Sequence, residues 1–222
     1  NAVIRSMIAA GLIASAPLAH AANNLVYCSE GSPAGFDPGQ YTTGPCPTQT
    51  FDGLPLFRPG HEPDAPEIAR RREAYFAPYH AALQAEIDRL QTLHPTIVLY
   101  EAHSIRSIVP KLFEGRLPEF NIGTNSGQSC APELAQAIAA ICAVQQRSHV
   151  VDGRFKGGWT TRHYGQPATG VHAIQMELAM RTYLDEVPEA DWPPPYDDIR
   201  AVEAHMTLRP ILTAAIDFAR AQ

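Results

Sequence analysis

Cysteine and basic residues are scarce in this sequence, and each scarcity excludes a class of protein. The 222 residues include four cysteines without a C-x-x-C pair, so a structural zinc site built on cysteine is not expected. Lys and Arg number 17 against 23 Asp and Glu, and the formal net charge is −6. A nucleic-acid or anionic-membrane partner is therefore not expected, although a few arginines can still bind a small anion.

Several common catalytic motifs are also missing. The chain has no G-x-S-x-G elbow, no H-E-x-x-H pair and no G-x-x-x-x-G-K-[ST] loop. These absences argue against a serine hydrolase, a zincin and a P-loop protein. Internal repeats and low-complexity tracts are absent too.

The N-terminal segment has the layout of a secretory signal peptide. Arg5 precedes an apolar run from Met7 to Leu18, and Ala19-His20-Ala21 follows as an A-x-A cleavage site. The run is shorter than the about 20 residues that a membrane-spanning helix needs. We expect cleavage near residue 22 and a periplasmic mature chain if the signal is used. The alternative is a buried N-terminal helix. The even number of cysteines permits disulfides in an exported chain without fixing their pairing.

The next stretch, LVYCSEGSPAGFDP, resembles the mature N-terminus of the periplasmic dipeptide/oligopeptide-binding proteins of ABC importers. The resemblance covers about residues 23–44, and no later part of the chain continues it. One strand of a large two-lobed binder cannot form a ligand cleft alone. We therefore interpret the chain as a chimera: a signal peptide (1–22), a binding-protein fragment (23–44) and a further domain (45–222).

Helical and strand patterns alternate beyond residue 44. Helices are predicted at 66–94, with a kink or break at Pro78, at 132–146 and at 197–221, and buried strands at 96–100 and 148–151. Cys142 falls in one of the apolar helices and is expected in the core. The alternation predicts an α/β fold: three layers, with a largely parallel sheet between flanking helices.

The segment EAHSIR comes directly after the predicted strand 96–100. Glu101, His103 and Arg106 are therefore expected at the carboxyl edge of the sheet, where open α/β sheets bind ligands. A histidine beside a carboxylate at this edge is well placed to bind a metal, with Glu101 holding the imidazole from behind. The alternative is a histidine that is hydrogen-bonded in a loop.

The segment GRFKGGWTTRHYG, residues 153–165, is rich in glycine and is predicted to be a tight, exposed loop. Arginine pairs bidentately with carboxylates, which makes Arg106, Arg154 and Arg162 the candidates for binding a small anionic substrate. The same loop carries His163. Solvated surface charges are the alternative interpretation.

The segment GVHAIQMELA alternates as a strand does. Its apolar face carries Ile174, Met176 and Leu178, and its polar face carries Gln175 and Glu177. A carboxylate on an otherwise apolar strand suggests a function for Glu177; the alternative is a surface or salt-bridged glutamate. His172 lies on the apolar side and is expected to be structural.

Five segments resemble the N-formylglutamate amidohydrolase (N-formylglutamate deformylase) family and keep its order: CPTQTFDGLPLF, EAHSIRS, FEGRLPEFNIGT, GRFKGGWTTRHYG and GVHAIQMELA. They extend the resemblance over about residues 38–222. It implies a metal-dependent hydrolase with a zinc-carboxypeptidase-like (phosphorylase/hydrolase-like) fold. It also implies cleavage of N-formyl-L-glutamate to formate and L-glutamate, a normally cytoplasmic step of histidine degradation.

The resemblance also implies roles for single residues. His103 is similar to the last zinc ligand, and Glu177 to the general base that acts on a metal-bound water. The arginines at 106, 154 and 162 are expected on the two substrate carboxylates. Glu101 and His163 are expected to contact and orient these groups without touching the metal or the substrate. The family more often has Asp at the position of Glu101.

The first metal ligands and leading strands of the family lie in an N-terminal region that has no counterpart here. The implied zinc site is therefore incomplete, and replacement ligands would have to come from residues such as Glu30, Asp37, His61 and His163. We expect a weak or inactive deformylase. The alternatives are an exported peptide-binding fragment and a fusion without function. The sequence does not indicate an oligomeric state.

Overall fold

The computed structural model describes residues 25–28, 46–50, 53–187 and 193–221. The elements, in chain order, are β1 (Leu25–Cys28), α1 (Ala65–Arg71), the π-helix η1 (Arg72–Phe76), α2 (Ala77–Gln91), β2 (Ile97–Ile105), β3 (Phe120–Gly123), α3 (Pro132–Val144), β4 (His149–Val151), α4 (Trp159–Tyr164), the 3₁₀ turn η2 (Pro167–Thr169), β5 (Val171–Ala179), the 3₁₀ turn η3 (Met180–Thr182) and α5 (Asp198–Ala221). The predicted signal peptide lies outside the described residues. Within them, no helix combines the length and the apolar character that a membrane span needs.

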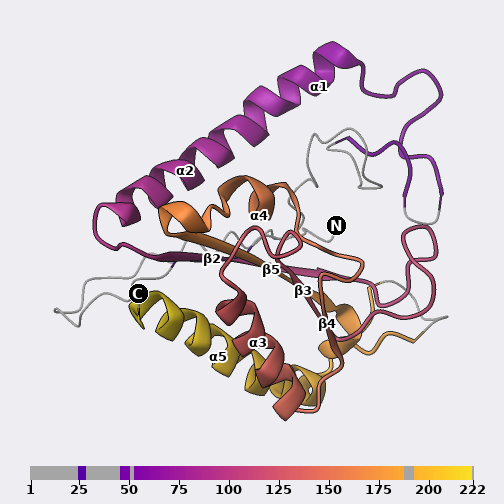
Figure 1. The fold of residues 1–222 in the computed structure, drawn as a ribbon. Helices are drawn as coiled ribbons and strands as arrows, with labels where there is room; N and C mark the ends of the chain where they lie inside the picture. The colour runs from indigo at the N-terminus through magenta and orange to yellow at the C-terminus, as the bar shows by residue number, and fades with distance from the viewer. Residues whose placement is uncertain (1–24, 29–45, 51–52, 188–192, 222) are drawn as a thin grey trace.

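The strands form one sheet in the order β1-β2-β5-β3-β4. The pairs β1–β2, β2–β5 and β3–β4 are parallel, and β3–β5 is antiparallel. Helices α3 and α5 cover one face of this sheet, whereas α2 and α4 cover the other (Figure 1). The predicted three-layer α/β fold is confirmed, with one antiparallel pairing in an otherwise parallel sheet.

The core consists of two apolar clusters, because successive side chains of a strand point to opposite faces. On the α3/α5 face, Ile122 and Ile174 are fully buried against Leu134 and Ile211. On the other face, α2 and α4 pack on the first halves of β2 and β5, at residues such as Leu99. The second halves of these strands carry polar side chains on that face, and they form the candidate site.

Pro78 changes the long helix without ending it. The predicted kink or break is replaced by a π-helical turn over 72–76, in which the N–H of Ala77 donates to the carbonyl of Arg72. Proline has no N–H and its ring collides with a carbonyl of the preceding α-turn. The wider turn accommodates both features, and the helix continues to Gln91.

Two local predictions are wrong. The strand predicted as buried at 148–151 is β4, an edge strand, and its Val151 is 40% exposed. The segment predicted as loop contains the helix α4, whose buried residues Thr160, Thr161 and Tyr164 face the sheet. The C-terminal helix is present as predicted, and Pro210 lies within it. Cys142 is fully buried in the core, also as predicted.

Gly170, between η2 and β5, allows two backbone segments to approach each other. Its φ is +81°, and a Cβ there would overlap the carbonyl oxygen of Pro95. Gly127 has the same left-handed conformation, φ +82°, with nothing within 4 Å of a Cβ. We expect Gly170→Ala to lower the free energy of unfolding by about 2 kcal/mol and Gly127→Ala by about 1 kcal/mol. Urea denaturation of both variants measures the difference, and equal losses would show that the close approach costs nothing.

Candidate functional site

Strand β2 continues through the segment that was predicted to follow it. The prediction ended the strand at residue 100, whereas the structure extends it to Ile105. Glu101 and His103 therefore lie within the sheet, and Arg106 is the first residue after the strand. The reason is the long pairing with β5, which continues to Ile105 opposite Ala179.

The strand register brings the polar side chains together. Glu101 is opposite Gln175, and His103 is opposite Glu177, between β2 and β5. Asn121 of β3 is opposite Glu177 on its other side. Because side chains directly opposite each other share a face, these five residues form one group, which we call the polar row.

A buried ion pair lies within the polar row. Nε2 of His103 is 3.0 Å from Oε1 of Glu101, and the two side chains are 13% and 2% exposed. Nε2 has no hydrogen-bond partner among the described residues, so this contact is electrostatic. The other carboxylate oxygen, Oε2, accepts a hydrogen bond of 2.6 Å from the hydroxyl of Thr161.

The charges of this pair support each other. Burial opposes the charge of Glu101, but the His103 imidazole and the hydroxyls of Thr161 and Thr160 hold the pKa of this carboxyl below its usual value. Burial also opposes a charged imidazole, but Glu101 and Glu177 raise the pKa of His103 above its usual value. The pair therefore favours a carboxylate beside an imidazolium in the absence of a metal.

Glu177 has the opposite character. Burial and the nearby charge of Glu101 raise its pKa to about 7, although His103 and Gln175 act against the shift. The side-chain amide of Gln175 donates to its Oε2 at 3.2 Å, and the amide oxygen accepts from the N–H of Gly158 at 2.6 Å. A carboxyl group with a pKa near neutrality can both accept a proton from water and return it.

The predicted substrate-binding arginines come from different elements. Arg162 is on α4 and donates to the carbonyl of Gly157 at 2.8 Å. Arg154 is in the loop before α4 and donates to the carbonyl of Leu112 at 2.7 Å. Arg106 follows β2. Their roles toward a substrate stay predictions.

The two remaining histidines of the sequence analysis differ in surroundings. His163 is exposed, and its ring stacks on Trp159 with the centroids 4.0 Å apart. Its predicted supporting role stays a prediction. Nδ1 of His172 accepts from the N–H of Ala131 at 3.0 Å, and the ring meets Phe218 edge-on. The contacts of His172 are those of a structural residue, as predicted.

The described residues do not complete a metal site. They contain no group of three or more His, Cys, Asp and Glu side chains arranged to hold an ion. His103 offers an imidazole, but its Nε2 is 3.0 Å from Glu101. A catalytic zinc requires three protein ligands. Glu30 and Asp37, two of the suggested replacements, lie outside the described residues, and the predicted zinc stays a prediction.

Sequence reasoning missed two residues that contact the site. The sequence predicts a loop at Thr161, and the contact of this residue with Glu101 spans 60 positions. The sequence predicts no strand at Asn121, whose side-chain amide nitrogen donates to the carbonyls of Pro118 and Glu177 at 2.9 and 3.0 Å. The alternation of β5 already placed Gln175 beside Glu177.

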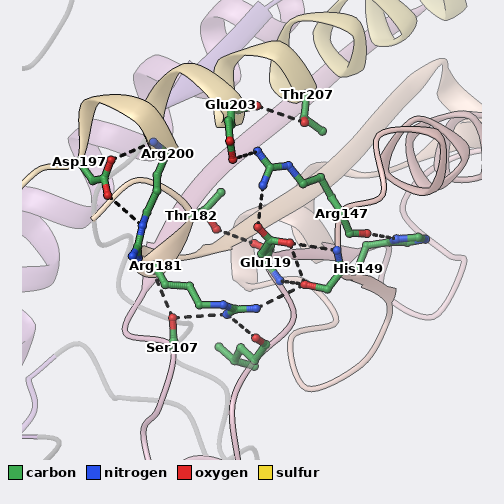
Figure 2. A network of polar contacts seen from close by, with 12 residues as sticks. Ser107, Glu119, Arg147, His149, Arg181, Thr182, Asp197, Arg200, Glu203 and Thr207 are labelled. Atoms are coloured by element: carbon green, nitrogen blue, oxygen red, sulfur yellow. Dashed lines mark hydrogen bonds and ion pairs between the residues drawn. The ribbon is translucent and has the colours of Figure 1, made fainter. Parts of the chain in front are cut away.

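A second polar network joins α5 to the segment before β3 (Figure 2). Arg147 contacts Glu119 at 3.0 Å and Glu203 of α5 at 3.2 Å. Arg181 of η3 donates to the carbonyl of Leu117 at 2.6 Å. These contacts connect segments that are distant in the sequence, and none of these side chains belongs to the polar row. The network therefore provides control positions for experiments on the site.

Known proteins resemble this chain in both sequence and fold. A family model described as N-formylglutamate amidohydrolase matches residues 14–184. The chain is 53% identical over 146 residues to an N-formylglutamate deformylase of Pseudomonas aeruginosa PAO1, covering 65% of this chain and 55% of that protein. The chain thus spans about half the length of this relative.

Two further similarities concern the fold and the N-terminal segment. The crystal structure of N-formylglutamate amidohydrolase from Ralstonia eutropha JMP134 matches with a TM-score of 0.62 at 20% identity, over 76% of this chain and 59% of that one. Di/tripeptide-binding protein 3 of Pseudomonas aeruginosa UCBPP-PA14 is 71% identical over 41 residues, which are 18% of this chain and 8% of that protein.

Proposed function

Because the chain belongs to the N-formylglutamate amidohydrolase family, we propose that its polar row performs the proton transfers of amide hydrolysis on N-formyl-L-glutamate. The observation that carries the proposal is the pairing of Glu177, whose pKa is about 7, with His103 across adjacent strands. A carboxyl group with a pKa near the working pH is an efficient general base.

In the proposed reaction, Glu177 takes a proton from the water that attacks the formyl carbon. The same carboxyl then gives a proton to the departing amine, and formate and L-glutamate leave. The amide of Gln175 keeps the carboxylate oriented during both transfers. The family resemblance adds a divalent metal near His103. Because the described residues do not complete its ligand set, we assign no step to that metal.

Substrate recognition is proposed to rely on arginine. N-formyl-L-glutamate carries two carboxylates, and a guanidinium can bind a carboxylate with two parallel hydrogen bonds. Arg162 on α4 directly follows Thr161, which contacts the polar row. Arg106 follows the strand that carries His103. Arg154 is the third candidate.

The proposed function is tested by formate release from N-formyl-L-glutamate, with N-formyl-L-leucine as the substrate that lacks the side-chain carboxylate. Both are assayed with added Zn²⁺ and with chelator, and bound zinc is measured in the same samples. We expect weak but selective release from N-formyl-L-glutamate, with less than one zinc per chain, because the ligand set is incomplete. Equal rates for the two substrates, or no release above buffer, would contradict the proposal.

Arg162→Gln is expected to raise KM for N-formyl-L-glutamate about tenfold while kcat changes little. The lost guanidinium binds the substrate and the transition state equally, and a hydrogen bond to a charged group contributes about 1.5–3 kcal/mol. Arg89→Gln is the matched control, because Arg89 contacts Glu86 on the exposed side of α2. Steady-state kinetics separate the two constants. A fall in kcat without a change in KM would assign Arg162 to another role.

A second candidate function is peptide binding after export, supported by the similarity to a di/tripeptide-binding protein. Calorimetry of the purified mature chain with dipeptides tests this candidate, since a tight complex without formate release would favour it. N-terminal sequencing tests export: a mature start near residue 23 supports it, and an intact Asn1 in the cytoplasmic fraction excludes it.

A further inference from the structure

The glycines before α4 bring this helix close to the sheet. A Cβ on Gly123 of β3 would lie 2.6 Å from the backbone nitrogen of Gly157. Gly157 has φ +111°, and a Cβ there would lie 2.8 Å from a methyl group of Thr161. No side chain fits at either position without moving the loop or α4. The glycine-rich segment 153–165 is predicted to form an exposed loop, but its Gly157 instead allows the close approach of α4 to Gly123 of the sheet.

The close approach places the hydroxyl of Thr161 on the polar row. Thr161 is fully buried, and Glu101 is 1% exposed. The hydroxyl donates to Oε2 of this carboxylate at 2.6 Å, while Oε1 is 3.0 Å from Nε2 of His103. The carboxylate thus bridges α4 and the imidazole. Hydrogen bonds to an ionised acceptor are stronger than neutral ones.

We infer that Thr161 is a positioning residue of the site: its hydroxyl fixes the Glu101 carboxylate so that Glu101 holds the His103 imidazole beside Glu177. This inference rests on the proposed function of the polar row. Without the hydroxyl, one oxygen of a buried carboxylate loses a partner, and the carboxylate can turn about its terminal bond. The imidazole then loses its fixed orientation.

Thr161→Val and Thr161→Ser separate the hydroxyl from the space it fills. Valine keeps the shape and removes the donor, whereas serine keeps the donor and removes a methyl group. The matched control is Thr207→Val, because Thr207 on α5 is also buried, at 1% exposed, and bonds only weakly, at 3.4 Å, to the carbonyl of Glu203. If Thr161→Val does not fold, Thr161→Cys replaces it, since a thiol is a weak donor of similar size.

The first measurement is NMR of ¹⁵N-labelled imidazoles in the full chain, at one fixed pH and with chelator. The His103 signal is the one that is lost in His103→Gln. We expect Thr161→Val to shift or broaden this signal, and Thr161→Ser and Thr207→Val to leave it at the wild-type position. The inference is wrong if Thr161→Val moves the signal no more than Thr207→Val, or if serine behaves as valine does.

The second measurement is formate release by the same variants. Loss of a supporting hydrogen bond of this kind lowers activity about 10–100-fold, and we expect this fall in kcat of Thr161→Val with KM nearly unchanged. Thr161→Ser should restore kcat to within about threefold of wild type. If the wild-type chain releases no formate, the proposed function fails, and the NMR measurement alone decides the role of Thr161.

Discussion

Glu177→Gln is expected to lower kcat for formate release about 10²–10⁴-fold, the usual contribution of a general base. Glutamine has nearly the same shape and cannot accept the proton. Its amide oxygen can still accept the hydrogen bond that Gln175 donates to Glu177. The position is 6% exposed in the wild type, so a neutral amide causes no additional desolvation of charge. KM is therefore expected to change much less than kcat.

Glu119→Gln is the matched control for this prediction. Glu119 is also a glutamate with a carboxylate in a polar network. Its network is the one in Figure 2, where the carboxylate accepts a hydrogen bond of 3.0 Å from Arg147. We expect a loss of stability in this variant and a kcat within about twofold of wild type, because the network is separate from the polar row. Steady-state kinetics of the two variants decide the matter. Equal losses of kcat would indicate a general structural effect and contradict a proton-transfer role for Glu177.

The sequence predicts which side chains share a face where the alternation of apolar and polar residues lies within one strand. The period of two in β5 is enough to place Gln175 and Glu177 on one face, and the structure confirms that arrangement. The length of β2 could not be predicted in this way. Its second half is polar, and it is a strand because it pairs with the equally long β5.

Contacts between distant segments could not be predicted. The hydrogen bond from Thr161 to Glu101 depends on the approach of α4 to the sheet, which Gly123 and Gly157 permit from two further segments. The pairing of Asn121 with Glu177 depends on an antiparallel strand of four residues, too short for a periodic signal. Most residues of the site could therefore be predicted from the sequence, whereas the contacts between them could be seen only in the folded structure.

The contribution of Glu177 to the free energy of unfolding is expected to fall as pH rises from about 4.5 to about 7. The folded pKa of Glu177 is about 7, raised from 4.5 mainly by burial, so the folded state binds more protons than the unfolded state between these values. Stability from this group is fully present below pH 4.5 and is lost as pH rises through 7. Each pKa unit corresponds to about 1.4 kcal/mol, so a window of about 2.5 units gives up to about 3.5 kcal/mol.

Glu177→Gln isolates this contribution from those of its neighbours. The lowered pKa of Glu101 stabilises the folded state at pH values above the usual pKa of a glutamate. The raised pKa of His103 stabilises it at pH values below the usual pKa of a histidine. Both groups are also present in the variant, so the difference between wild type and Glu177→Gln reports mainly on Glu177. Urea denaturation of both proteins with chelator, at pH 4.5, 5.5, 6.5 and 7.5, measures this difference. It should change by up to about 3.5 kcal/mol in favour of the glutamine variant as pH rises. A difference that stays constant with pH, or changes in the opposite direction, would mean that Glu177 is already ionised at acidic pH, and its proposed role as a base near neutrality would lose its electrostatic support.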